Sequence, residues 1–228
     1  AEYDFNMLID CLPYFVEETR RCYGAVIPSP DDGALSYTKH TPVGVVVAVL
    51  TWNFPLLNLA YKLGPILATG CTCVIKPSEV TPLATSLAVS LLSECGFPAG
   101  VVNLVNGTGL DLLQPLCASK IPRLLTTIGS TVMGRRMIGY SNTSVKRFSL
   151  ELGGDAPVLV FADCDLDAAV EDILGLKYAN CGQICVSPNR VYVEASIYED
   201  FLEKAVAKAQ RYALGSGADH GGKDEVLQ

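Results

Sequence analysis

The sequence has no long apolar run and no block of basic residues. Its most apolar stretch, 43–50, is much shorter than the roughly 20 residues of a membrane-spanning helix. Its first residues, AEYDFNML, lack the basic segment and following apolar stretch of a signal peptide. The net charge is −7, and no group of basic residues exceeds the pairs Arg20-Arg21 and Arg135-Arg136. We therefore expect a chain that neither crosses a membrane nor binds nucleic acid.

Histidine, a frequent metal ligand, is also scarce. The sequence has only two histidines, His40 and His220, and both lie far along the chain from every pair of cysteines. The nine cysteines show no repeated CxxC spacing, so no zinc site is predicted. Their odd number, with several in apolar stretches, favours a reducing compartment such as the cytoplasm.

Apolar residues, in contrast, make up half of the 228 residues, enough for a substantial core in one large domain or two smaller ones. From Pro42 onward, short apolar runs alternate with helical patterns. The expected strands are 43–50, 71–76, 101–105, 123–129, 145–152 and 157–161. The expected intervening helices are 56–68, 83–95, 110–118 and 132–140. This order predicts an α/β fold with a doubly wound, Rossmann-like sheet of parallel strands buried on both faces.

Glycine, proline and hydroxyl residues mark the expected helix ends. Gly70 and Gly96 each end a helix, Thr81 followed by Pro82 begins one, and Ser130 begins another.

The flanking segments predict further elements. Residues 3–23 are expected to form a helix interrupted at Pro13, and 36–41 an exposed strand. Beyond the sheet, helices over 165–179 and 197–212 are expected to flank a strand over 190–194.

Polar residues follow two of the early strands, where a parallel sheet binds its ligands. Asn53, in TWNFP (51–55), is either a turn or cap residue or an amide that donates to a developing oxyanion. Lys76 and Glu79, in KPSE (76–79), are either solvated or a donor and an acceptor for a ribose.

Glycine-rich turns follow two later strands. In GSTVMG (129–134), Gly129 allows a tight turn and Ser130 opens a helix whose N-terminus attracts phosphate, although an ordinary strand-to-helix turn has the same pattern. The dinucleotide fingerprint GxGxxG is missing, and the nearest match, NGTG (106–109), follows the third strand rather than the first. A dinucleotide would therefore bind in an unusual way.

Two further motifs carry reactive groups. Glu151, in ELGG (151–154), is either a general base whose apolar neighbours raise its pKa or an exposed edge residue. Cys185, in NCGQIC (180–185), is either a nucleophile at a strand–helix junction or a buried inert thiol. An amide, a carboxylate, a thiol and a dinucleotide cradle together indicate oxidation through a covalent thio-intermediate.

The motif order WNFP, KPSE, GSTxxG, ELGG, GQxC resembles the NAD(P)-dependent aldehyde dehydrogenase superfamily, from about Ser36 to Arg211. The resemblance implies a cofactor-binding domain over 1–153, with one strand of an oligomerisation hairpin at about 34–47. It also implies the beginning of an α/β catalytic domain over 154–228, a homo-oligomer in the complete protein, and an aldehyde as substrate.

The resemblance also implies residue roles. Cys185 would attack the aldehyde, Asn53 and the Cys185 backbone N–H would hold the oxyanion, and Glu151 would activate water. The implied cofactor residues are Thr51, Trp52, Lys76, Ser78, Glu79, Gly109, Gly129, Ser130, Met133 and Leu152. A carboxylate at Glu79 favours NAD over NADP.

The sequence also departs from the family pattern. Thr127-Ile128 stands where Phe-Thr is usual, and Val132 where Glu is frequent. Members of the family are longer, so the resemblance implies a piece of a longer chain that alone binds NAD weakly and turns over poorly. Two alternatives stay open: a CoA-acylating or semialdehyde-specific relative, and a catalytically silent protein.

Overall fold

The computed structural model describes residues 2–215 and 226–227, and the chain folds as two compact units, Ala1–Leu152 and Gly153–Gln228. None of the helices described in these ranges is both long and apolar enough to cross a membrane.

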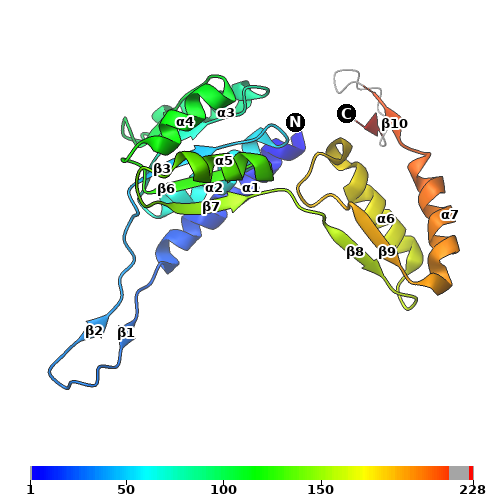
Figure 1. Cartoon of the computed structure of the whole chain (residues 1–228), viewed down its shortest axis with the longest axis horizontal. Coiled ribbons are helices and arrows are strands. Elements are labelled where there is room, and N and C mark those ends of the chain that lie inside the picture. The colour runs from blue at the N-terminus through cyan, green and yellow to red at the C-terminus, as the bar shows by residue number, and fades with distance from the viewer. Residues whose placement is uncertain (1, 216–225, 228) are drawn as a thin grey trace. The chain divides into compact units, whose positions relative to one another are not determined.

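Unit 1, whose chain runs from blue to yellow-green in Figure 1, is built on a five-stranded parallel sheet. The strand order is β5-β4-β3-β6-β7. The strands are β3 (Val45–Val49), β4 (Thr72–Lys76), β5 (Val102–Leu104), β6 (Leu124–Ile128) and β7 (Arg147–Glu151). The chain adds β4 and β5 on one side of β3, then returns to add β6 and β7 on the other. The order reverses between β3 and β6, which is the switch point where such sheets bind ligands.

Helices cover both faces of this sheet, which confirms the doubly wound fold. They are α2 (Pro55–Ala68), α3 (Pro82–Glu94), α4 (Gly109–Ala118) and α5 (Thr131–Tyr140). Successive β3 side chains point to opposite faces. Val46 and Ala48 pack with residues of α2 and α3, whereas Val47 and Val49 pack with residues of α4 and α5.

Strand β7 is the exception to burial on both faces. It is an edge strand, and four of its five residues are exposed. The expectation of a fully buried strand is wrong here, because the run 145–152 contains polar residues among its apolar ones. Within the described part of the chain, β7 also pairs with β6 alone.

Helix α1 (Glu2–Glu18) runs without a break through Pro13 and continues into the 3-10 helix η1 (Thr19–Arg21). The expected interruption is therefore wrong. The helix packs closely along α2, because a Cβ atom on Gly64 of α2 would lie 2.3 Å from Cδ2 of Phe15. This packing offsets the hydrogen bond that Pro13 removes.

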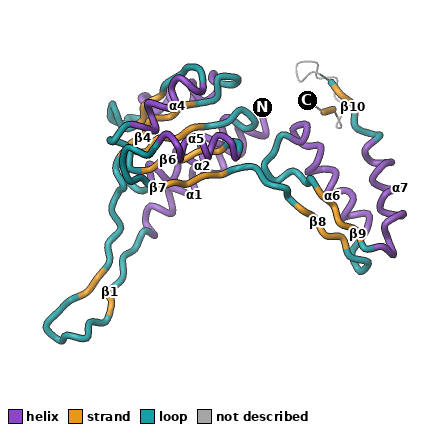
Figure 2. The backbone as a smooth tube through the Cα atoms, viewed as in Figure 1, coloured by secondary structure: helices purple, strands orange, loops and turns teal. Residues whose placement is uncertain are grey.

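Two short strands, β1 (Val26–Ile27) and β2 (Ser36–Tyr37), form an antiparallel hairpin that projects from the rest of unit 1 (Figure 2). The strand expected over 36–41 is thus limited to its first two residues. The segment 34–47 is not one strand, because β2 ends at Tyr37 and β3 begins at Val45. The partner strand β1 was not predicted, because two residues give no detectable alternation.

Unit 2 has a separate two-stranded parallel sheet of β8 (Pro157–Val160) and β9 (Arg190–Val193). The other elements are η2 (Ala179–Gly182), η3 (Ala195–Ile197), the helices α6 (Leu166–Tyr178) and α7 (Tyr198–Ala209), and the paired strands β10 (Ala213–Leu214) and β11 (Val226–Leu227). The core joins Val160, Val170, Ile173 and Phe201.

Strand β8 does not continue the series of unit 1, although the alternation of runs predicted it. Only the five residues 152–156 separate β7 from β8. A parallel neighbour needs a crossover of about a dozen residues or more, so β8 cannot pair in parallel with β7, and it pairs with β9 instead.

Candidate functional site

The carboxyl ends of four adjacent strands bring most of the predicted residues of unit 1 to one sheet edge. Val49, at the end of β3, lies opposite Lys76 of β4 and opposite Thr127 of β6. Ile128 in turn lies opposite Glu151 of β7. The segments that follow these positions hold Thr51 to Asn53, Ser78 and Glu79, Gly129 and Ser130, and Leu152.

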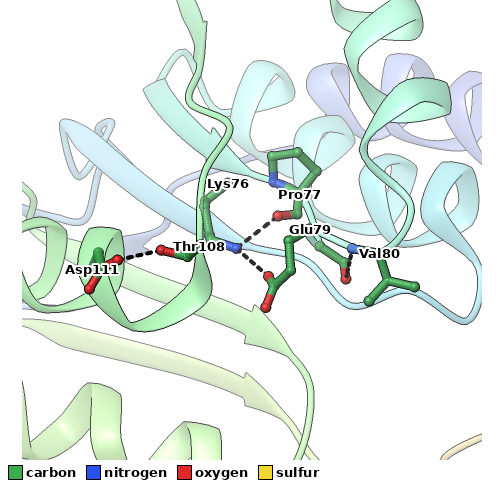
Figure 3. Close-up of polar contacts among 7 residues, drawn as sticks. Lys76, Pro77, Glu79, Val80, Thr108 and Asp111 are labelled. Carbon is green, nitrogen blue, oxygen red and sulfur yellow. Dashed lines mark hydrogen bonds and ion pairs between the residues drawn. The ribbon is translucent and has the colours of Figure 1, made fainter.

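Lys76 and Glu79 form an ion pair at this edge. The Lys76 ammonium donates to Glu79 Oε2 and to the Pro77 carbonyl oxygen, each at 3.0 Å (Figure 3). The Lys76 side chain is only 3% exposed, whereas that of Glu79 is 54% exposed. The lysine is therefore not a solvated surface group, and the turn presents a fixed cation beside an accessible carboxylate.

The surroundings of Glu79 hold its carboxyl group ionised. A hydrogen bond from its own backbone N–H and a second from Lys76 lower the pKa of Glu79. Gly109, the first residue of α4, lies against this carboxylate, since a Cβ atom there would come within 3.2 Å of Oε1. Ser78, which is buried, accepts from the Val80 N–H at 3.2 Å and shapes the same turn. Together these groups offer one donor and one acceptor, as a ribose requires.

The Thr51–Asn53 segment, which follows β3, is held by a buried amide from α2. Asn58 Nδ2 donates to Asn53 Oδ1 at 3.2 Å, and its distance to the Thr51 carbonyl oxygen is 3.5 Å. Trp52 offers its carbonyl oxygen to the Thr81 hydroxyl at 3.4 Å. Thr81 stands before α3 as predicted, but its hydroxyl bonds Trp52 and does not cap the helix.

The turn after β6 is formed as predicted. Ser130 is the N-cap of α5, and its hydroxyl oxygen accepts from the Met133 N–H at 3.1 Å. Gly129 donates its N–H to the Glu151 carbonyl oxygen at 3.0 Å, which ties this turn to the end of β7. Because α5 starts at the switch point, its N-terminal N–H groups are placed for a phosphate.

Leu152 packs against α5, and Gly134 makes this possible. A Cβ atom on Gly134 would lie 2.9 Å from Leu152 Cδ1. Gly134, the last residue of GSTVMG, has no role that can be predicted from the sequence, because its contact is with a residue 18 positions later. The final glycine of the motif marks this close approach.

Glu151 is exposed at the end of β7, so the apolar surroundings expected from its neighbours are not found among the described residues. A second group near it was not predicted. Lys62 of α2 is 7% exposed, and burial lowers its pKa while the Glu151 charge partly opposes that shift. Lys62 was overlooked because a single lysine inside a helical pattern resembles a solvated face.

In unit 2, Cys185 lies in the turn between η2 and β9, with Ser187 donating its N–H to the Ile184 carbonyl oxygen at 3.0 Å. The connection runs from helix to strand, so the expected strand–helix junction is wrong. Cys185 and Cys181 are both exposed, which rules out a buried thiol for either residue.

The backbone just before Cys185 is unusual. Asn180, Cys181 and Gly182 have φ values of 51°, 54° and 74°. A non-glycine residue with positive φ is strained, and two in succession occur where the surrounding structure holds them. At Gly182 a Cβ atom would lie 3.0 Å from the Lys177 carbonyl oxygen, so glycine fits there best.

Comparison with known proteins identifies relatives across nearly the whole chain. The profile of the aldehyde dehydrogenase family matches residues 1–223. A mitochondrial succinate-semialdehyde dehydrogenase of Oryza sativa subsp. japonica is 42% identical over 208 residues, which cover 91% of this chain and 40% of that protein.

Solved structures give the same result. An NADP-dependent enzyme of E. coli superposes with a TM-score of 0.92 at 37% identity, covering 98% of this chain and 46% of that one. Betaine aldehyde dehydrogenase from Staphylococcus aureus in complex with NAD+ has a TM-score of 0.92 at 34% identity, covering 98% and 44%. The chain thus spans less than half the length of each of these three relatives.

Proposed function

Because the chain belongs to the aldehyde dehydrogenase family, we propose that the protein oxidises an aldehyde to a carboxylic acid with a nicotinamide dinucleotide as hydride acceptor. One observation carries the proposal: Asn53, the Lys76–Glu79 pair, the Ser130 cap and Glu151 all lie at or just after the carboxyl ends of adjacent strands. This edge is where an open parallel sheet binds its ligands.

The cofactor fits the residues of this edge. Lys76 would donate to and Glu79 would accept from the hydroxyls of the adenosine ribose, and the N-terminus of α5 with Gly129 and Ser130 would hold the pyrophosphate. Leu152 would contact the nicotinamide, and the remaining cofactor residues would be Thr51, Trp52, Ser78, Gly109 and Met133. The dinucleotide, when bound, supplies a two-electron acceptor.

The protein's own residues carry the remaining chemistry. The Cys185 thiolate attacks the aldehyde carbon, and the resulting oxyanion accepts hydrogen bonds from the Asn53 amide and the Cys185 backbone N–H. Loss of hydride from this thiohemiacetal leaves a thioester. Glu151 removes a proton from water, the hydroxide adds to the thioester carbon, and the carboxylic acid leaves with return of the thiolate.

The cofactor is NAD in this proposal. The Glu79 carboxylate, which the lowered pKa keeps ionised, accepts from a ribose 2′-hydroxyl and repels a 2′-phosphate. The relatives include both an NADP-dependent enzyme and an NAD+ complex. Replacing Glu79 with Gln removes the repulsion, so the ratio of kcat/KM for NAD to that for NADP should fall.

The two compact units have separate roles in this proposal. Residues 1–153 form the cofactor-binding domain, and 154–228 begin the catalytic domain, which the division after Leu152 supports. The complete protein is a homo-oligomer of a reducing compartment, with strands of the β1–β2 hairpin at its interface. The isolated 228-residue chain binds NAD weakly and turns over slowly, because it spans less than half the length of its relatives.

A semialdehyde substrate is a second proposal, which the name of the rice relative favours. A kinetic screen of aliphatic, aromatic and semialdehyde substrates tests it, and added CoA distinguishes an acyl-CoA product from a free acid. Preference for a plain aliphatic aldehyde would count against the semialdehyde.

The decisive experiment compares the two neighbouring cysteines. In a form of the protein that oxidises aldehydes, Cys185→Ala should abolish NADH production, whereas Cys181→Ala should keep most of it. Both thiols are exposed, so the pair is a matched control. Equal loss from the two substitutions would contradict the assigned roles, and rapid turnover by the isolated chain would contradict the expected dependence on further residues.

A further inference from the structure

The first turn of α2 has no cap from its own sequence neighbours. Phe54, at the N-cap position, makes no side-chain bond to the helix, and Pro55 has no N–H. The Asn58 N–H donates to the Phe54 carbonyl oxygen at 2.8 Å. The N–H groups of Leu56 and Leu57 therefore need acceptors from elsewhere in the chain.

Asp4 of α1 supplies both acceptors. Its Oδ2 accepts from the Leu56 N–H at 3.0 Å and its Oδ1 from the Leu57 N–H at 2.9 Å. The two leucines lie 52 and 53 positions after Asp4 in the sequence. Asp4 is only 8% exposed. Its carboxylate satisfies both donors and places a negative charge at the positive end of the helix.

A ring contact beside Asp4 ties the same two segments together. The Tyr3 and Phe54 rings meet edge to face, with centroids 6.1 Å apart. Helix α1 therefore holds the WNFP turn through two successive residues, one polar and one aromatic.

The capped turn also carries the side chain that orients Asn53. Asn58 is 4% exposed, and its Nδ2 donates to Asn53 Oδ1 at 3.2 Å. Asn58 thus fixes the oxygen of the Asn53 amide. The amide nitrogen, which is the donor that an oxyanion requires, is fixed with it, because both atoms belong to one planar group.

We propose that Asp4 is a positioning residue for Asn53: it fixes the first turn of α2, and that turn, through Asn58, fixes the amide. The inference rests on the proposed role of Asn53 in holding an oxyanion. An oxyanion donor acts only when it is held in place before the reaction, so a frayed first turn reduces its effect.

Amide hydrogen exchange, followed by NMR on the 228-residue chain, tests the placement directly. In the unchanged chain, the Leu56 and Leu57 amides should exchange slowly, because both are hydrogen-bonded. Asp4→Asn keeps the shape but loses the charge and one acceptor oxygen, so exchange at these amides should accelerate by about tenfold. The side-chain NH2 resonances of Asn53 should shift at the same time.

Asp10→Asn is the matched control, since it makes the same substitution at an exposed position of α1 and should change neither signal. If Asp4→Asn does not fold, Asn58→Leu provides the second test: Leu56 and Leu57 stay protected while the Asn53 resonances shift. Fast exchange at Leu56 and Leu57 in the unchanged chain overturns the proposal. So does acceleration by Asp4→Asn with the Asn53 resonances unmoved, because Asp4 would then be a helix cap and no more.

Kinetics in an aldehyde-oxidising form of the protein test the consequence. Removing an oxyanion donor costs about 10²–10³ in kcat, so partial misplacement by Asp4→Asn should lower kcat by about tenfold with KM for the aldehyde unchanged. In an Asn53→Ala background the same substitution should cause no further loss, and additive losses overturn the proposal. If no form oxidises aldehydes while the exchange results hold, the proposed function fails and the placement of Asn53 by Asp4 stands.

Discussion

Replacing Gly64 with Ala tests the packing of α1 on α2. A Cβ atom at this position would lie 2.3, 2.8 and 2.9 Å from three atoms of the Phe15 ring. Carbon atoms in contact are separated by about 3.5–4.0 Å, so the ring or the helix must move. Overpacking of this kind costs about 1–3 kcal/mol of the free energy of unfolding.

The same substitution also has a favourable effect. Alanine is preferred to glycine in a helix by about 0.8–1 kcal/mol, so the expected net loss is about 1 kcal/mol. Urea denaturation followed by circular dichroism measures this difference. In unit 1, Gly139→Ala in α5 is the control, because nothing lies within 4 Å of its added Cβ atom, and it should raise stability by a few tenths of a kcal/mol or more.

A double mutant separates the ring clash from other causes. In a Phe15→Ala background, the added methyl group meets no ring, so Gly64→Ala should become neutral or stabilising. If Gly64→Ala stabilises the unchanged protein as much as Gly139→Ala does, Phe15 does not lie against Gly64 and the described packing of α1 is wrong.

Three further measurements follow. Burial raises the pKa of Cys73 to about 12 and that of Cys117 to about 11. At neutral pH, iodoacetamide should therefore modify the exposed cysteines and leave these two unmodified until the protein unfolds, and mass spectrometry locates the modified residues. Because the folded state lowers the pKa of Glu79 below its ordinary 4.5, the contribution of this carboxylate to stability is complete above pH 4.5 and is lost as the pH falls through the lowered pKa. Glu79→Gln should therefore reduce the dependence of the urea midpoint on pH below pH 4.5. Ser187 Oγ is buried with no hydrogen-bond partner among the described residues. Ser187→Ala should therefore leave the free energy of unfolding unchanged or raise it by up to about 1 kcal/mol, whereas a decrease of more than about 1 kcal/mol would show that the hydroxyl has a partner.

The strands and helices of unit 1 could be predicted because each is a local pattern. The β3 run 43–50 is apolar at every position, and Gly70 and Gly96 end helices with φ values of 73° and 80°. Ser130 needed only its neighbour Met133, three residues away, to form its cap. Patterns that join residues only a few positions apart can be recognised in a single sequence.

The missed features depend on partners far along the chain. Pro13 predicted a break, but the packing of α1 on α2 outweighs a single lost hydrogen bond. Asp4 looks like any acidic residue near a helix start until Leu56 and Leu57 are brought to it. Cys185 was placed at the wrong kind of junction because the short η2 segment resembles no regular element in the sequence.

The contact between Leu152 and Gly134 has a mechanical consequence. Leu152 is the last residue of unit 1, and its side chain is wedged against α5, whereas added Cβ atoms at Gly153 and Gly154 would meet nothing within 4 Å. The chain is thus held by the Leu152 side chain, whereas Gly153 has open space around it and Gly154 is held through its carbonyl oxygen, which accepts from Asn189 Nδ2 at 3.2 Å. Both members of this contact lie within unit 1, so a chimaera joined after Leu152 takes Gly134 and Leu152 from the same parent protein.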